Sequence, residues 1–289
     1  MINFKKYIII LCFACLAFFI PQNIKAIELS AQQLEILQQE ILLLQTLINN
    51  YNLNKGIDSA SYIAVDISDN SVVLEKNSNQ SLPIASITKL MNAVISLENI
   101  DLNKTIVLTD QMLLPLGQSP CIYSGLQISA ENLLKSALIQ SSNDAAEALS
   151  YFIGKEKFID LMNQKALEIG MKNTIYYDAN GLNLKNKSTA TDLAKLISYI
   201  DKNYPKIWEI GKNNDFWLPD QTGRMLKFKN VNNFYPIHNF IGGKTGYTIE
   251  AKQTIASVFE INNRKIAIIV LYSNNRIADV FEIIKKIRK

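Results

Sequence analysis

Three short motifs, S-x-x-K, S-x-N and K-T-G, follow one another along this chain of 289 residues. They are Ser86-Ile87-Thr88-Lys89, Ser141-Ser142-Asn143 and Lys244-Thr245-Gly246. S-x-x-K and K-T-G each occur once, whereas Ser68-Asp69-Asn70 and Ser273-Asn274-Asn275 also fit S-x-N. Only Ser141-Ser142-Asn143 lies between the other two motifs, so their order along the chain selects it. Any fold of this chain has to bring these three segments together if they form one site.

Motifs of these types in this order form acyl-transfer sites that use a serine and no histidine. At the start of a helix, the Ser86 hydroxyl would lie near the positive end of the helix dipole. Lys89 follows one turn later on the same face, so its amine can reach the serine oxygen. That amine is a base only when neutral, and burial beside a second cation, Lys244, would lower its pKa. We therefore predict Ser86 as the nucleophile and Lys89 as the general base.

Ser141 and Asn143 are predicted to serve the same reaction. The Ser141 hydroxyl can pass a proton between Lys89 and the leaving nitrogen, and Asn143 can bind an amide of the acyl part of the substrate. Both residues also lie where one predicted helix ends and the next begins. A capping role there is compatible with a role in the site.

The K-T-G segment is predicted to bind substrate. Gly246 leaves room for a substrate along the edge of a strand, and Lys244 with Thr245 offers a cation and a hydroxyl to a carboxylate. The backbone N–H groups of Ser86 and Tyr247 are the expected donors to the oxyanion.

The composition is that of a globular protein, with 48% hydrophobic and 19% charged residues. The formal charge of +4 is small and spread along the chain, so nucleic acid is not predicted as a partner. His238 is the only histidine, and Cys121 is the only cysteine outside an N-terminal apolar run. One histidine and one cysteine cannot supply the usual ligands of a zinc peptidase. We predict neither a metal nor a cofactor.

Residues 1–26 have the features of an export signal. Two lysines precede an apolar run, Tyr7 to Ile20, and a polar stretch then ends at Ala26. The run is short for a membrane span. Ile24 departs from the usual cleavage pattern, so both a cleaved signal and a retained membrane anchor stay open. Either one predicts an exported protein, in the periplasm or on the outer face of the cytoplasmic membrane.

Residues 27–56 differ in character from the rest of the chain. Apolar residues at spacings of three and four predict an amphipathic, glutamine-rich helix over residues 30–50. The spaced residues are Leu34, Leu37, Ile41, Leu44 and Ile48. Self-association, packing on the catalytic body and contact with a membrane are the open alternatives for this helix. A polar linker would lead from it to residue 57.

Residues 57–289 are predicted to form one catalytic domain. Helices are expected at 86–97, 130–140, 144–153, 156–169, 191–200 and 281–287, and strands at 62–67, 71–75, 225–228, 254–261 and 265–272. Strands at both ends with helices between them indicate an α/β fold. Its sheet would be built from the two ends of the domain, beside a helical lobe from the middle.

The residues around the motifs extend this pattern. They are Pro83-Ile84-Ala85-Ser86-Ile87-Thr88-Lys89, Gln140-Ser141-Ser142-Asn143-Asp144-Ala145, Gly243-Lys244-Thr245-Gly246-Tyr247-Thr248, Gly170-Met171-Lys172-Asn173-Thr174 and Asn180-Gly181-Leu182 through Ser188-Thr189-Ala190. Over residues 57–289 the sequence resembles the serine D-alanyl-D-alanine carboxypeptidases, the low-molecular-mass penicillin-binding proteins. The resemblance implies the penicillin-recognising serine-transferase fold, an antiparallel sheet flanked by helices. It also implies peptidoglycan stem peptides as substrates and an acyl-enzyme that β-lactam antibiotics form as covalent inhibitors.

The sequence departs from the pattern of this family at three places. Ser142 stands where the family often has glycine, and Ala251-Lys252-Gln253 replaces the usual Ala-Gly beyond K-T-G. Substrate contacts at that end of the strand are therefore not carried over. Larger members also add a C-terminal β-rich domain that this sequence does not show. In lacking this domain, the sequence resembles the subgroup of DD-endopeptidases, which cut peptide cross-links.

The sequence leaves three alternatives to a D-alanyl-D-alanine carboxypeptidase. A DD-endopeptidase is the nearest alternative. A class A β-lactamase would need a glutamate in an E-x-x-L-N-like segment, and the candidates lack that context. They are Glu147, Glu156, Glu168 and Glu209. A non-catalytic cell-wall binding protein would not need the intact motifs.

Overall fold

The structure, a computed structural model, describes residues 39, 56–113, 119 and 121–288. Residues from 56 onward belong to one compact unit. The predicted export signal, and all of the predicted 27–56 segment except Gln39 and Gly56, lie outside the described residues. No helix among the described residues is long and apolar enough to span a membrane.

The central element is a five-stranded antiparallel sheet in the order β2-β1-β11-β10-β9. Its strands are β1 (Ser61–Asp66), β2 (Val72–Lys76), β9 (Phe240–Thr248), β10 (Lys252–Ile261) and β11 (Arg264–Ser273). Strand β1 pairs with β11, so the two ends of the domain meet in the middle of the sheet. The predicted sheet of terminal strands is confirmed.

The sheet is covered on both faces, and for this reason its central strand β11 is apolar from Ile266 to Leu271. In β11, Ile266, Ile268 and Val270 belong to one hydrophobic cluster, while Ala267, Ile269 and Leu271 belong to the other. Successive side chains of a strand point to opposite faces, so both sets are buried. A sheet with one wet face would instead show a polar residue at every second position.

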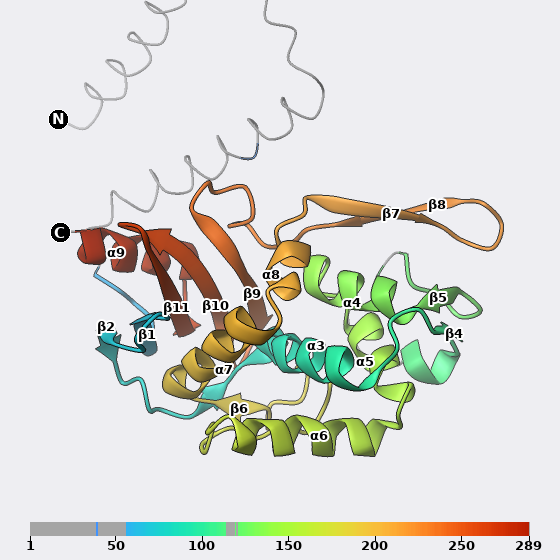
Figure 1. Ribbon diagram of the computed structural model, residues 1–289, viewed down its shortest axis with the longest axis horizontal. Coiled ribbons are helices and arrows are strands. Elements are labelled where there is room, and N and C mark those ends of the chain that lie inside the picture. Colours follow the sequence, from blue (N-terminus) through green and yellow to red (C-terminus); the bar gives the residue numbers. More distant parts are fainter. Residues whose placement is uncertain (1–38, 40–55, 114–118, 120, 289) are drawn as a thin grey trace, which may run out of the picture. The chain divides into compact units, whose positions relative to one another are not determined.

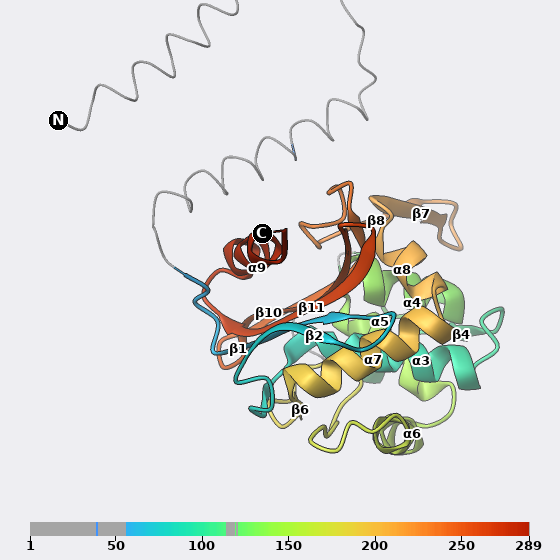
Figure 2. The same ribbon diagram turned by 60° about the vertical axis from the view of Figure 1, so that its left-hand side comes forward.

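The helical lobe covers one face of the sheet, and the C-terminal helix covers the other (Figure 2). The lobe contains α3 (Thr88–Asn99), α4 (Ala130–Ile139), α5 (Asn143–Tyr151), α6 (Lys155–Glu168), α7 (Ala190–Asn203) and α8 (Lys206–Gly211), and the C-terminal helix is α9 (Arg276–Arg288). Two short 3-10 helices, η1 (Ala85–Ile87) and η2 (Asp110–Leu113), precede α3 and α4 respectively. Helix caps fix several boundaries: Ser129 and Thr189, for example, accept hydrogen bonds from Asn132 N and Asp192 N.

The described residues also form three small two-stranded ribbons (Figure 1). They are β3 (Leu82–Pro83) with β6 (Lys187–Ser188), β4 (Thr105–Val107) with β5 (Gln127–Ser129), and β7 (Asp215–Pro219) with β8 (Met225–Lys229). The ribbon β7–β8 projects beyond the lobe, and its Phe216 and Phe228 rings stack with centroids 4.4 Å apart.

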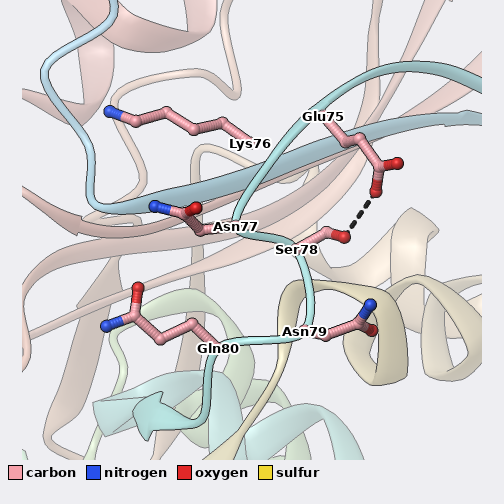
Figure 3. A pocket seen from close by; sticks show the side chains of 6 residues that line it. All are labelled: Glu75, Lys76, Asn77, Ser78, Asn79 and Gln80. Carbon is pink, nitrogen blue, oxygen red and sulfur yellow. Dashed lines mark hydrogen bonds between the residues drawn. The ribbon is translucent and has the colours of Figure 1, made fainter.

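The loop after β2 is tied to the helical lobe by hydrogen bonds. It lines a surface pocket formed by residues 75–80, where the Ser78 hydroxyl donates to Glu75 (Figure 3). Thr191 donates to the Ser78 carbonyl from its backbone N at 3.0 Å and from its hydroxyl at 3.2 Å. This loop therefore anchors the start of α7 and contains no residue of the three motifs.

Most predicted elements are found close to their expected bounds, but several are longer or were not predicted. Helix α9 begins at Arg276, five residues before the predicted start at Phe281, because Asn275 caps it by accepting from Ala278 N at 3.1 Å. Helix α8 and strand β7 were not predicted. Helix α8 has only six residues and β7 only five, and periodicity is weak over such lengths.

The cluster between the sheet and α9 is rich in phenylalanine. Phe234 meets Phe240, Phe259 and Phe281 with ring centroids 5.8 to 6.3 Å apart. Phe240 and Phe259 also pack edge to face at 5.4 Å. These side chains hold α9 on the outer face of β10.

Replacing one of these rings should destabilise the domain strongly. Phe259→Ala removes a fully buried ring and leaves a cavity, so we expect a loss of about 3–5 kcal/mol in the free energy of unfolding. Val72→Ala is the control, because Val72 is 52% exposed and should change stability by only about 0.5 kcal/mol or less. Urea denaturation followed by circular dichroism measures both. Equal losses in the two variants would contradict this account of the core.

Candidate active site

Ser86 lies in η1, directly before α3. The helix thus starts slightly later than predicted, and Ser86 remains next to its N-terminal end. Ala85, the residue before it, has φ of +49°, an unfavourable value for a residue with a side chain. Lys89 lies in the first turn of α3, and its Nζ is 2.9 Å from Ser86 Oγ. The predicted contact between the two residues is present.

The Lys89 amine is completely buried and surrounded by oxygen atoms. Besides Ser86 Oγ it donates to Asn143 Oδ1 at 2.7 Å and to the Asn180 carbonyl at 2.6 Å. Burial lowers the pKa of Lys89 to about 7, although the carboxylates of Asp178 and Asp144 act in the opposite direction. A large fraction of Lys89 is therefore neutral near neutral pH, as a base has to be.

The S-x-N segment is the sharp junction between α4 and α5. Ser141 has φ of +59°, and the hydroxyl of Ser142 caps α5 by accepting from Ala145 N at 3.1 Å. Asn143, the first residue of α5, reaches Lys89. Capping and active-site contacts are thus divided between neighbouring residues of one motif.

The K-T-G segment lies in β9, an edge strand of the sheet. The side chain of Lys244 is buried, and its Nζ donates to Ser141 Oγ at 2.7 Å and to the Thr245 carbonyl at 2.8 Å. Burial lowers the pKa of Lys244 well below its usual value, and the positive charges of Lys89 and Arg276 lower it further. All three motifs therefore meet in one site through Lys89 and Lys244.

Gly246 lies directly against the segment that contains Ser86. A Cβ atom at this position would be 2.9 Å from Ser86 N, 3.0 Å from Ala85 Cβ and 2.6 Å from Thr254 Oγ1. The hydroxyl of Thr254 in turn donates to the Ile84 carbonyl at 3.2 Å. A glycine is required here because backbone packs on backbone.

Arg276 is a half-buried cation of the site that was not predicted. It is the first residue of α9, and its Nη1 donates to the Gly246 carbonyl at 2.9 Å. Burial lowers the pKa of Arg276 to about 10. The sequence had a signal for it, since Asn275 is a good cap for a helix starting at Arg276.

Tyr247 and Lys252 lie at the far end of β9 and the start of β10. Tyr247 is 65% exposed. Lys252, which stands where the family usually has glycine, has φ of +52°, a value that glycine adopts without strain. Its Nζ contacts Asn274 Oδ1 at 3.0 Å and lies 4.4 Å from the centre of the Tyr272 ring. These contacts offset part of the cost of the strained backbone.

The remaining candidates of the sequence analysis lie apart from these contacts. His238 is exposed on the loop before β9. Cys121 is half-buried, and its thiol donates to the Lys227 carbonyl. In the part of the chain that the structure describes, no three His, Cys, Asp or Glu side chains are placed to hold a metal ion.

Comparison with known proteins gives relatives over most of this chain. A family model described as D-alanyl-D-alanine carboxypeptidase, Peptidase_S11, matches residues 48–275. A D-alanyl-D-alanine endopeptidase of Escherichia coli is 32% identical over 230 residues, covering 74% of this chain and 71% of the relative. The D-alanyl-D-alanine carboxypeptidase DacF of Bacillus subtilis is 32% identical over 224 residues, covering 73% of this chain and 57% of the relative.

Solved structures show the same fold. The crystal structure of a D-alanyl-D-alanine carboxypeptidase from Mycobacterium tuberculosis superposes with a TM-score of 0.75 and 25% identity, over 80% of this chain and 91% of that one. The predicted class, an antiparallel sheet flanked by helices with a helical lobe, is confirmed. Because the family model spans most of the chain, this protein belongs to the Peptidase_S11 family of serine DD-peptidases.

Proposed function

We propose that this protein is a D-alanyl-D-alanine carboxypeptidase that acts on peptidoglycan stem peptides through an acyl-enzyme. One observation carries the proposal: Lys89 is buried, has a pKa of about 7 and lies 2.9 Å from Ser86 Oγ. Neutral Lys89 takes the proton of Ser86 as the serine oxygen attacks the carbonyl of the penultimate D-alanine. The terminal D-alanine then leaves, and water hydrolyses the ester.

Proton delivery to the leaving nitrogen is assigned to Ser141. Its oxygen accepts from Lys244, so its own proton is free to point elsewhere. In the proposal Ser141 donates that proton to the leaving nitrogen and is reprotonated from Lys89. Lys244 favours this transfer because its N–H donates to the Ser141 oxygen, where negative charge develops.

Substrate binding is assigned to Asn143 and to the edge of β9. Asn143 binds an amide of the acyl part, and the buried Lys244 with Thr245 attracts the terminal carboxylate. Arg276 adds positive charge beside Gly246. The backbone N–H groups of Ser86 and Tyr247 are the proposed donors to the oxyanion. β-Lactam antibiotics are the corresponding covalent inhibitors, because they acylate the same serine.

A DD-endopeptidase is the second candidate. Several relatives are named D-alanyl-D-alanine endopeptidases, including the Escherichia coli protein described above. The same acyl transfer would then cut a cross-link instead of releasing a terminal residue. The residues and their proposed roles are the same for both reactions.

We also propose that the protein is exported and works in the periplasm or on the outer face of the cytoplasmic membrane, in cell-wall biogenesis and cell shape. The export features of residues 1–26 support this. Membrane association would come from a retained N-terminus, and self-association from residues 30–50. Cell fractionation with N-terminal sequencing of the isolated chain tests export, and the chain staying in the cytoplasm would contradict it.

Digestion of purified muropeptides tests the reaction and separates its two forms. We expect loss of a terminal D-alanine from pentapeptides, detected by mass spectrometry; conversion of cross-linked dimers to monomers would instead indicate the endopeptidase. Ser86→Ala should lower the rate roughly 10³-fold or more, since the nucleophile is lost. Ser71→Ala, at an exposed serine in the β1–β2 turn, is the matched control and should keep full activity. Full activity in Ser86→Ala would refute the proposal.

The rate of acylation by a β-lactam should depend on pH through Lys89. Its pKa of about 7 means that the neutral base predominates above pH 7 and is lost below it. The rate constant should therefore reach a plateau at alkaline pH and fall about tenfold per unit below about pH 7. Stopped-flow measurements with a chromogenic cephalosporin give this profile. Lys89→Arg should not acylate at any of these pH values, because a guanidinium stays protonated. A flat profile, or rapid turnover of the cephalosporin, would count against the proposal.

A further inference from the structure

A buried carboxylate, Glu147, lies behind the site and is not part of any of the three motifs. It belongs to α5, one helical turn after Asn143, and is 3% exposed. A buried carboxylate is costly unless it is paired. The groups that pair with Glu147 therefore indicate its role.

Each oxygen of Glu147 has its own partner. Oε1 forms an ion pair with Lys155 Nζ at 2.5 Å, and Oε2 accepts a hydrogen bond from Asn180 Nδ2 at 2.9 Å. Lys155 is half-exposed at the start of α6, and the bond to Glu147 raises the pKa of Lys155. Asn180 is buried. The carboxylate thus joins a surface cation to a buried amide.

Asn180 connects this carboxylate to the proposed base. Its carbonyl accepts the hydrogen bond from Lys89 Nζ at 2.6 Å, and its side-chain Oδ1 accepts from Leu182 N at 2.9 Å. Both polar ends of the Asn180 side chain are therefore occupied, one by Glu147 and one by the turn itself. The direction of the carbonyl toward Lys89 depends on these two bonds.

The same turn forms a wall behind Ser86. Gly181 has φ of +92°, and a Cβ atom there would be 2.2 Å from the Ala85 carbonyl oxygen and 3.0 Å from Ser86 N. The turn therefore cannot move toward Ser86 without a steric clash. A shift of Asn180 would move the acceptor of Lys89 and the support of the Ser86 backbone together.

Helix α5 thus reaches Lys89 by two routes. Asn143 contacts the amine directly, and Glu147 acts through Asn180. We propose that Glu147 is a positioning residue that holds the Asn180 carbonyl against Lys89 through its hydrogen bond to the Asn180 side chain. The inference rests on the proposed role of Lys89 as the base. Because Glu147 does not contact Ser86 or the K-T-G strand in these interactions, it should affect the acylation step and not the affinity for substrate.

Acylation kinetics under saturating conditions test this, since they separate the dissociation constant of a chromogenic cephalosporin from the acylation rate constant. Glu147→Ala should lower the acylation rate constant about ten- to a hundredfold, as small displacements of reacting groups do, and leave the dissociation constant unchanged. Glu147→Gln keeps an oxygen acceptor for Asn180 and should restore most of the rate. Lys155→Ala is the matched control, because it removes the other partner of Glu147 and leaves the bond to Asn180.

Thermal denaturation accompanies each variant, and Phe259→Ala serves as a variant destabilised on the other face of the sheet that should acylate normally. The inference is overturned if Glu147→Ala folds and acylates at the wild-type rate, or if Glu147→Gln is as slow as Glu147→Ala. If Glu147→Ala does not fold, Asn180→Ala replaces it, because this variant keeps the backbone carbonyl and the Glu147–Lys155 pair. Asn180→Ala should show the same slow acylation, and acylation at the wild-type rate would also overturn the inference. Failure of the wild-type protein to acylate would instead refute the proposed function itself.

Discussion

The burial of the Lys89 amine is the constraint on which the rest of the site depends. Moving an ammonium group out of water costs several kcal/mol of solvation free energy. This cost is on the order of the free energy of unfolding of a whole domain. The fold offsets this with oxygen atoms from three separate segments: η1, α5 and the turn at Asn180. Asn92, the next residue on that face of α3, bonds to the carbonyls of Ala146 and Ala179 and so holds two of these segments in place.

Two glycines from distant parts of the chain complete this arrangement. Gly181 and Gly246 both lie within 3.0 Å, measured from an added Cβ, of Ser86 N or the neighbouring Ala85. The backbone that carries Ser86 is therefore held between a loop of the helical lobe and the edge of the sheet. Neither surface could approach so closely with a side chain. The site is assembled by backbone contact between the two layers, and its lysines are buried as a result.

The sequence predicted the sheet, the main helices and the three motifs, because these depend on local periodicity and on residue types at fixed spacing. It also predicted a lowered pKa for Lys89, but the two expected causes do not contribute equally in the structure. Lys244 was expected to contribute as a second cation, whereas burial is the main cause for Lys89. The carbonyl of Asn180 was not predicted, since every residue has a carbonyl and only the tertiary fold decides which one meets Lys89. The same holds for Glu147, which in the sequence is only a glutamate outside any motif.

Strand β9 is an edge strand of the sheet, and the exposed backbone groups of an edge strand can pair with other chains and cause aggregation. Helix α8 packs on one face of this strand, since a Cβ on Gly242 would lie 2.7 Å from the Trp208 side chain. At the K-T-G segment the Lys244 side chain points into the protein, where its Nζ bonds to Ser141 and to the Thr245 carbonyl. The lysine that is proposed to attract a substrate carboxylate thus lies on an edge strand, where the backbone of an extended peptide finds hydrogen-bonding groups to pair with.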